Sequence, residues 1–305
     1  MPVGAAGAET GNGAVGLRRA VVDAAAGLAA AGVASPRVDA EFLAAHVLGI
    51  DRGRLALVAA LSADQAERYR DLVARRALRV PLQHLTGSAP FRWLDLAVGP
   101  GVFIPRPETE LLVEWGLAGL GGRPVVVDLC SGSGAVAIAV AQECPDAEVY
   151  AVELDRAALT WLTGNVAAHG RGRVTVVAGD AGAPRVLADL DGRVDLVLCN
   201  PPYVPDATVV EPEVAGHDPA LAVFGGPDGL TVIRRVVDRA AGLLRAGGRV
   251  GIEHDDSHDQ AVVDLLCAHG GYRAAAAHRD LAGRPRFATA VRRDAAGTAV
   301  ADLPL

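Results

Sequence analysis

Apolar residues recur with two different periods along the 305-residue chain. Between about residues 17 and 78 they follow helical spacing, as in Phe42, Leu43 and Val47, and glycine- or proline-containing turns interrupt the pattern. This spacing gives each helix one apolar face. Several short helices in succession predict a small helical bundle.

From residue 125 onward, short runs rich in valine alternate with helical stretches. The runs that we expect to be strands are 125–129, 148–152, 174–177, 194–199 and 249–253. Strands that alternate with helices form a parallel sheet with helices on both faces, and ligands of such sheets bind at the carboxyl ends of the strands. The predicted fold class is therefore α/β, with a doubly wound, mostly parallel, Rossmann-like sheet after the helical bundle.

The segment between these regions predicts a β-hairpin. Residues 91–98 and 101–104 read as extended segments on either side of a turn at Gly99-Pro100. The expected organisation comprises a disordered tail, a helical substrate-recognition domain, a hairpin linker, the α/β domain and a second tail. These parts span residues 1–16, 17–80, 81–106, 107–293 and 294–305, respectively.

Composition narrows the classes of partner. The net charge is −7 and there is no long basic run to neutralise phosphates, so direct binding to nucleic acid is not expected. The four cysteines, at positions 130, 144, 199 and 267, lack the spacing of a zinc site or a disulfide framework. No apolar run is long enough to span a membrane, and we expect a soluble, cytoplasmic protein without a membrane partner.

Three predicted strand ends carry residues suited to a nucleoside. The loop from Asp128 to Gly134 could approach a ligand closely, although a purely structural turn would look alike, and its spacing differs from the G-x-G-x-x-G of dinucleotide sites. Glu153 could bind two ribose hydroxyls, and Asp180 could accept a hydrogen bond from adenine or cap the next helix. Together these positions favour S-adenosylmethionine as cofactor. The candidate binding residues are Phe103, Asp128, Cys130, Ser131, Gly132, Ser133, Gly134, Glu153, Asp180, Ala181 and Asn200.

The fourth predicted strand runs directly into Asn200-Pro201-Pro202-Tyr203, the candidate catalytic tetrapeptide. Its prolines fix the backbone and hold Asn200 in an extended geometry. The Asn200 side-chain oxygen and the Pro201 carbonyl could each accept one N–H of a planar NH2 group, while Tyr203 packs against that group. The tetrapeptide could thus aim a weak nitrogen nucleophile at a reactive methyl group.

Several longer motifs point to one family. They lie at residues 35–41, 81–87, 103–110, 211–213, 217–219, 224–229 and 283–287, in addition to the tetrapeptide. Through them the chain resembles the HemK/PrmC family of release-factor glutamine methyltransferases over nearly its whole length. The resemblance implies a class I S-adenosylmethionine-dependent methyltransferase domain at residues 107–293. It also implies transfer to the N5 amide nitrogen of the glutamine in the Gly-Gly-Gln motif of class I peptide chain release factors, by an enzyme that we expect to be monomeric.

Some positions depart from the family pattern. Cys130 replaces a frequent glycine, Glu153 stands where aspartate is frequent, and Ala181 stands where a bulkier residue can cover the adenine. The loop that follows Glu253 and His254 also differs. These departures lead us to expect weaker packing around the cofactor, with the chemistry unchanged.

Three other functions remain open from the sequence: methylation of a glutamine in a ribosomal protein, methylation of adenine N6 in nucleic acid, and a non-catalytic module that binds a translation factor. A metal site is not expected, because His254 and His258 lack a third ligand, and we interpret them as solvated loop residues. Arg106, Arg284 and Arg286 could pair with the cofactor carboxylate or an acidic partner, or form surface ion pairs.

Overall fold

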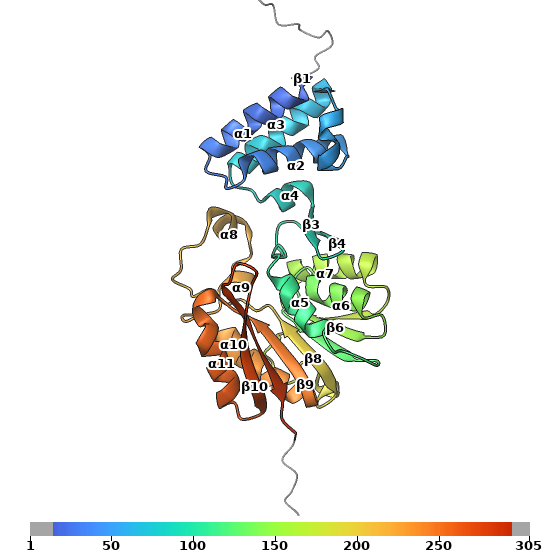
Figure 1. The fold of residues 1–305 in the computed structure, drawn as a ribbon, viewed down its shortest axis with the longest axis vertical. Helices are drawn as coiled ribbons and strands as arrows, with labels where there is room; N and C mark the ends of the chain where they lie inside the picture. Colours follow the sequence, from blue (N-terminus) through green and yellow to red (C-terminus); the bar gives the residue numbers. More distant parts are fainter. Residues whose placement is uncertain (1–14, 295–305) are drawn as a thin grey trace, which may run out of the picture. The chain divides into compact units, whose positions relative to one another are not determined.

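The structure is a computed structural model that describes residues 15–294. The chain forms two compact units, Met1–Gly87 and Ser88–Leu305, which are described separately (Figure 1). The predicted tails at 1–14 and 295–305 lie outside the described residues. None of the helices within residues 15–294 has both the length and the apolar character that a membrane crossing requires.

The first unit is the predicted helical bundle. Its core is formed by buried side chains such as Leu28, Leu43 and Tyr69. A buried ion pair joins two of the helices, with 2.7 Å between Arg76 Nε and Asp39 Oδ2. The elements are β1 (Val15–Gly16), α1 (Leu17–Ala30), α2 (Pro36–Leu48), η1 (Arg52–Leu57), β2 (Ala60–Leu61), α3 (Ala63–Ala77) and α4 (Leu82–Thr86).

The structure corrects the predicted start of this bundle. We expected residues 15 and 16 to belong to the disordered tail, whereas they form β1 and pair with Leu61 and Ala60 of β2. The bond from Leu17 N to Ala59 O, 3.0 Å long, continues this pairing into α1. Backbone pairing with a segment some 45 positions away has no local sequence signal.

The second unit opens with a β-hairpin whose turn lies elsewhere than predicted. Strands β3 (Ser88–Phe91) and β4 (Leu94–Ala97) turn at Arg92 and Trp93, so the predicted position of the hairpin is wrong. A turn does form at Gly99-Pro100, closed by a hydrogen bond from Val102 N to Gly99 O over 3.4 Å, but it does not join two paired strands. Arg92 adopts a left-handed backbone with φ of 51°. Its N–H donates to Glu110 Oε1 over 2.8 Å, and its guanidinium pairs with Glu143, so tertiary contacts stabilise a turn that local propensity does not predict.

The predicted parallel sheet is confirmed and gains an antiparallel edge. The strand order is β10-β11-β9-β8-β5-β6-β7. The sheet consists of β5 (Val125–Leu129), β6 (Glu148–Glu153), β7 (Val174–Ala178), β8 (Val194–Cys199), β9 (Leu244–Glu253), β10 (Tyr272–Arg279) and β11 (Pro285–Arg292). The first five were predicted, and the antiparallel pair β10 and β11 was not.

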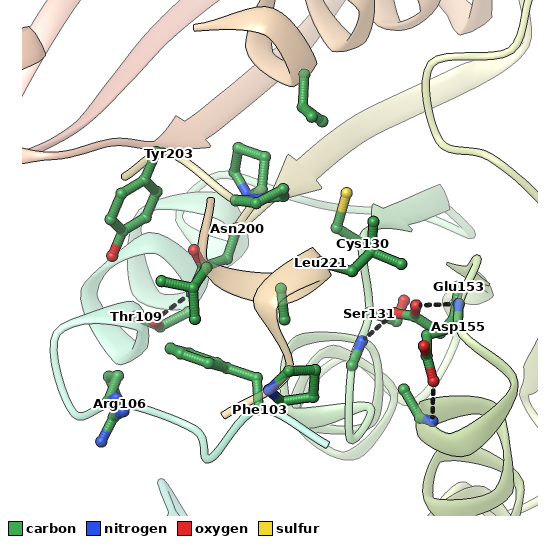
Figure 2. A pocket seen from close by; sticks show the side chains of 18 of the residues that line it. Phe103, Arg106, Thr109, Cys130, Ser131, Glu153, Asp155, Asn200, Tyr203 and Leu221 are labelled. Atoms are coloured by element: carbon green, nitrogen blue, oxygen red, sulfur yellow. Dashed lines mark hydrogen bonds between the residues drawn. The ribbon is translucent and has the colours of Figure 1, made fainter. Parts of the chain in front are cut away.

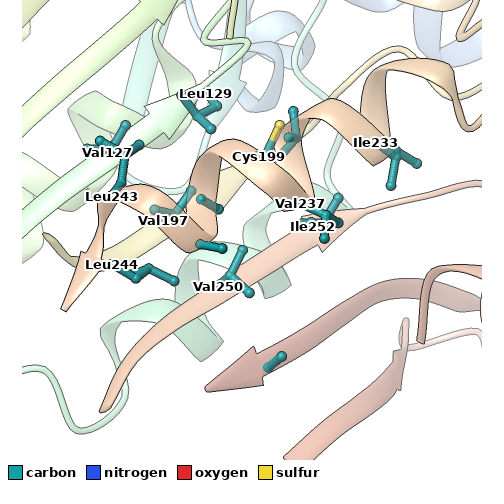
Figure 3. Close-up of a cluster of buried hydrophobic side chains, with 14 of the residues drawn as sticks. Val127, Leu129, Val197, Cys199, Ile233, Val237, Leu243, Leu244, Val250 and Ile252 are labelled. Carbon is teal, nitrogen blue, oxygen red and sulfur yellow. The ribbon is translucent and has the colours of Figure 1, made fainter. Parts of the chain in front are cut away.

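Helices cover both faces of this sheet (Figure 1). Along β8, Leu196 and Leu198 point to one apolar cluster, whereas Val197 and Cys199 point to the other (Figure 3). All four are fully buried, which accounts for a continuous apolar run in place of alternation with polar residues. One face is covered by α5 (Thr109–Leu117), α6 (Ala135–Glu143) and α7 (Arg156–His169), and the other by α10 (Thr231–Leu243) and α11 (Asp259–Ala268).

The longest connection runs from the end of β8 to α10. It contains the short helices α8 (Pro212–His217) and α9 (Ala220–Val223). Elsewhere in this unit, single 3-10 turns form at η2 (Ala188–Leu190), before β8, and at η3 (Asp256–His258), after β9. Since β5, β6 and β8 are parallel neighbours, their carboxyl ends meet at one edge, where the connection after β8 begins.

Candidate functional site

A cavity of about 640 Å³ lies at the carboxyl ends of these strands (Figure 2). Nearly all of the predicted site residues line it. They are Phe103, Asp128, Cys130, Ser131, Gly132, Ser133, Glu153, Asp180, Ala181, Asn200, Pro201, Pro202 and Tyr203. The structure therefore brings together both candidate sets, those for the cofactor and those for catalysis.

Gly134 does not line the cavity, in contrast to the prediction. It lies at the start of α6 with a left-handed φ of 89°. A Cβ atom at this position would lie 2.7 Å from Leu162 Cδ1 and 3.0 Å from Ile138 Cδ1. Gly134 is therefore required for the close packing of α6 against α7, and its contact with a cofactor stays a prediction.

The loop between β5 and α6 turns through left-handed conformations. Gly132 has a φ of 55°, and Cys130 has a φ of 63°. For a residue with a Cβ atom this conformation costs about 1–2 kcal/mol, which explains why glycine suits position 130. The loop is held by the bond from Ser131 N to Val152 O, 2.9 Å long, and the cysteine side chain packs against the core cluster that contains Cys199.

Glu153 connects this loop to the end of β6. Its Oε2 accepts a hydrogen bond from Gly132 N, and its Oε1 accepts from Leu154 N and Asp155 N, each over 2.8 Å (Figure 2). Oε1 already accepts two hydrogen bonds, whereas Oε2 accepts one and keeps a further acceptor site, so the carboxylate can still bind a hydroxyl group. Binding of ribose by Glu153 stays a prediction.

The two aspartates that were predicted as site residues have pKa values shifted in opposite directions. Asp128 is 1% exposed, and burial raises its pKa to about 7, against the lowering effect of hydrogen bonds from Ser131 and Ala137 N. Asp180 is less buried, and although burial acts to raise its pKa, hydrogen bonds from Arg235 and Gly182 N bring the pKa below its usual value. The Arg235–Asp180 pair is 2.6 Å long, so this carboxylate already has a cationic partner.

The candidate catalytic tetrapeptide is hydrogen-bonded to two buried side chains that were not predicted from the sequence. Asn200 Nδ2 donates to Thr109 Oγ1 over 3.1 Å (Figure 2). The Tyr203 hydroxyl donates to Glu253 Oε1, also over 3.1 Å. Thr109 begins α5 and Glu253 ends β9, and they are 3% and 1% exposed. Because Asn200 uses its NH2 group as donor here, its side-chain oxygen is left to act as an acceptor.

Arg106 and the segment after β8 are joined across the cavity wall. Arg106 NH2 lies 2.8 Å from Asp218 Oδ2, and the Arg106 guanidinium lies 4.9 Å from the centre of the Phe103 ring. Asp218 is nearly inaccessible, and burial raises its pKa against the lowering effect of Arg106. Arg286, which also lines the cavity, pairs with Asp280 over 3.0 Å. Of the outcomes considered for Arg106 and Arg286, pairing within the chain is observed.

The histidines after β9 are not solvated, as we had expected them to be. His254 is fully buried and its Nδ1 lies 2.8 Å from Asp255 O, while His258 is 8% exposed. They are covered because this segment packs against β11. The backbone N–H of His254 donates a hydrogen bond to the carbonyl oxygen of Arg286 in β11. Within residues 15–294, no group of three or more His, Cys, Asp or Glu side chains is arranged to hold a metal ion.

Comparison with known proteins identifies the family. The model of the PrmC N-terminal domain matches residues 19–87, and that of the methyltransferase small domain matches residues 107–216. The release factor glutamine methyltransferase of Mycolicibacterium smegmatis is 53% identical over 277 residues, which cover 90% of this chain and 98% of the relative. The Mycobacterium tuberculosis protein of that name is 50% identical over 281 residues, covering 90% and 91% of the two chains. The chain belongs to the release factor glutamine methyltransferase family.

Membership confirms the resemblance inferred from the sequence motifs and places the protein among methyltransferases. A crystal structure of a Pyrococcus furiosus methyltransferase has the same fold, with a TM-score of 0.51 at 16% identity over 73% of this chain and 99% of that one. The predicted Rossmann-like methyltransferase fold is thereby confirmed. The roles of individual residues in this member of the family are inferred from its own geometry.

Two signals in the sequence could have identified the missed residues. Thr109 lies within the 103–110 motif that carries part of the resemblance. Glu253 is the last residue of a predicted strand, at the edge of the sheet where ligands bind. The same rule had selected Asp128, Glu153 and Asn200, and its application to β9 would have added Glu253.

Proposed function

We propose that this protein transfers a methyl group from S-adenosylmethionine to the N5 nitrogen of the glutamine in the Gly-Gly-Gln motif of class I peptide chain release factors. The reaction would take place in the cytoplasm, where translation occurs, and the enzyme would act as a monomer. The names of the relatives at 50% and 53% identity support this substrate.

The cavity fits S-adenosylmethionine in size and in its polar groups. It is lined by the glycine-containing loop, by the Glu153 carboxylate at the end of β6, and by Asp128 at the end of β5. Glu153 Oε2 offers a further acceptor for a ribose hydroxyl, and Asp128 offers a carboxyl group near the loop. When bound, S-adenosylmethionine supplies a methyl group on a positively charged sulfur, which a nitrogen lone pair can attack.

The orientation of Asn200 is the observation that carries the proposal. A primary amide nitrogen is a weak nucleophile, because its lone pair is delocalised into the carbonyl group. With its own NH2 bound to Thr109, Asn200 presents Oδ1 as an acceptor for one N–H of the glutamine amide. The Pro201 carbonyl, fixed by the two prolines, would accept the other, and these two bonds orient the lone pair and stabilise the charge that develops on nitrogen.

Four acceptors in parallel assays test the assignment. The intact protein is incubated with methyl-labelled S-adenosylmethionine and a purified class I release factor, the same factor with Gln→Asn in its Gly-Gly-Gln motif, purified ribosomal proteins, or an adenine-containing oligonucleotide. We expect label in the unmodified release factor alone. Label in the ribosomal proteins or the oligonucleotide, with none in the release factor, would overturn the proposed substrate, and binding without transfer to any acceptor would indicate a non-catalytic module.

A further inference from the structure

We propose that Thr109 and Glu253 are positioning residues, which set the direction of a hydrogen-bond chain and so keep the side-chain oxygen of Asn200 available to the substrate amide. Neither residue needs to touch substrate or cofactor for this role. The inference rests on the proposed methyl transfer to a carboxamide and adds the reason why Asn200 faces the cavity as an acceptor.

The first part of the chain is the contact between Asn200 and Thr109. An asparagine amide can rotate by 180° and exchange its donor and acceptor ends at little cost unless its neighbours discriminate between them. A threonine hydroxyl alone does not discriminate, because it can donate or accept. Thr109 Oγ1 accepts from Asn200 Nδ2 only while its own proton is directed elsewhere.

In the inferred chain, Glu253 is the acceptor for that proton. Its carboxyl group is 1% exposed, and the Thr109 hydroxyl lowers its pKa as a hydrogen-bond donor does. Its second oxygen, Oε2, is buried and has no hydrogen-bond partner among the described residues, so it is the acceptor that the inferred bond from Thr109 would satisfy. An ionised carboxylate accepts only, so the chain can run in one direction: Asn200 donates to Thr109, and Thr109 donates toward Glu253.

A second branch couples the same carboxylate to the other end of the tetrapeptide. The Tyr203 hydroxyl donates to Glu253 Oε1 over 3.1 Å, and the tyrosine ring lines the cavity. One buried carboxylate thus binds the last residue of Asn200–Tyr203 directly and, in the inferred chain, the first residue through Thr109. A buried charged group that receives no hydrogen bonds is strongly unfavourable, which favours occupation of both branches.

The ionisation of Glu253 makes this device dependent on pH. Burial raises its pKa to about 7, against the lowering effects of Thr109, Tyr203 and Arg286, while Glu108 raises it further. The Cys199 thiol also faces it from β8 and is uncharged, because burial raises the pKa of that thiol. Below pH 7 the carboxyl group becomes protonated and can donate, so the chain loses its single direction and kcat should fall.

The first test measures kcat, KM for the release factor and Kd for S-adenosylmethionine in four variants. Thr109→Val removes the hydroxyl and Thr109→Ser retains it. Glu253→Gln places an NH2 donor at the end of the hydrogen-bond chain. Thr289→Val is the matched control, since Thr289 is also buried at 4% exposure and bonds His278 Nε2 over 2.9 Å, away from the cavity. All variants are compared at equal folded fraction, judged by circular dichroism.

We expect Thr109→Val and Glu253→Gln to lower kcat about 10- to 100-fold at saturating substrates. A misoriented Asn200 oxygen would no longer orient the glutamine amide or stabilise the charge that develops on its nitrogen. Both constants for substrate binding should stay within about threefold, and Thr109→Ser and Thr289→Val should stay within about threefold in kcat. The fall in kcat below pH 7 should disappear in Glu253→Gln. Wild-type kcat in either Thr109→Val or Glu253→Gln, or an unchanged acidic limb in the latter, would overturn the inference.

A second measurement does not depend on activity, so that it separates this inference from the proposed substrate. The chain contains three asparagines, at positions 12, 165 and 200, and selective 15N labelling of asparagine gives few side-chain NH2 signals. We expect the NH2 signal that is lost in Asn200→Ala to show slow hydrogen exchange in the wild type and fast exchange in Thr109→Val and Glu253→Gln. Equal exchange in all three proteins would overturn the hydrogen-bond chain even if the release factor is methylated. Slow exchange in an enzyme that does not methylate the release factor would uphold the chain and overturn the substrate.

Discussion

Gly132 donates its backbone N–H to Oε2 of Glu153 over 2.8 Å, which ties the loop after β5 to the end of β6. The other oxygen of the same carboxylate accepts from two further backbone N–H groups. Aspartate is frequent at this position in the family, and the longer side chain of glutamate allows the carboxylate to reach across to the loop. Glu153 therefore organises the cavity wall in addition to its proposed contact with ribose.

Replacement of this carboxylate should weaken cofactor binding. In Glu153→Gln one oxygen becomes an NH2 group that meets backbone N–H donors, so at least one of the three bonds is lost and the loop is displaced. We expect Kd for S-adenosylmethionine, measured by isothermal titration calorimetry, to rise about 10-fold or more. Glu148→Gln, at the exposed start of the same strand, serves as control and should leave Kd unchanged. A Glu153→Gln protein with the wild-type Kd would exclude this role.

Gly134 should tolerate no side chain. In Gly134→Ala the new methyl group would lie 2.7 Å from Leu162 Cδ1, with the backbone at φ of 89°. We expect the free energy of unfolding, from urea titration, to fall by about 1–3 kcal/mol. Gly164→Ala within α7 is a matched control, since nothing lies within 4 Å of its added Cβ, and it should stabilise by about 0.5–1 kcal/mol. Equal effects of the two substitutions would contradict the packing role of Gly134.

Cys130 should be replaceable by glycine without loss of stability. Its left-handed backbone costs about 1–2 kcal/mol, which glycine removes, while glycine loses about 0.5–1 kcal/mol through the entropy of the unfolded chain and gives up the packing of the thiol. We expect the free energy of unfolding of Cys130→Gly to lie within about 1 kcal/mol of the wild type. Cys130→Val, which is β-branched, should be destabilised by more than 1 kcal/mol. Chemical denaturation of the wild type and the two variants measures these differences. If Cys130→Val were the most stable of the three, the left-handed backbone at position 130 would not be the cause of the cost.

The buried Asp128 should make stability fall as pH rises. Its folded-state pKa of about 7 lies above the usual value, so the folded protein binds a proton that the unfolded chain releases. The associated stabilisation is complete below about pH 4 and is lost as pH rises to about 7. Relative to the wild type, Asp128→Asn should therefore gain about 2 kcal/mol in free energy of unfolding between pH 5 and pH 8. Glu253 is present in both proteins, so its own titration cancels in the comparison. A difference in free energy of unfolding that did not change with pH would argue against a raised pKa for Asp128.

The sequence predicted those features that depend on local pattern. Valine-rich runs identified β5 to β9, and the position of residues at strand ends brought Asp128, Glu153 and Asn200 to one cavity. Contacts between distant residues were missed. Thr109 lies 91 positions from Asn200, and Glu253 lies 50 positions from Tyr203, so no local pattern connects them.

The same reason explains the misplaced hairpin turn and the absent antiparallel edge. The turn at Arg92 depends on Glu110 and Glu143, which lie 18 and 51 positions further along the chain. Strand β10 carries a run of four alanines that has little strand propensity, and it is held in the sheet by pairing with β11. Burial of His254 and His258 likewise follows from packing under that edge.

The most direct measurement is mass spectrometry of a class I release factor after incubation with S-adenosylmethionine and either the wild-type protein or Asn200→Ala. We expect an added mass of one methyl group on the glutamine of the Gly-Gly-Gln motif with the wild type, and its loss with Asn200→Ala although S-adenosylmethionine still binds. Equal methylation by both proteins would exclude the proposed role of Asn200, and methylation at another residue would exclude the proposed substrate.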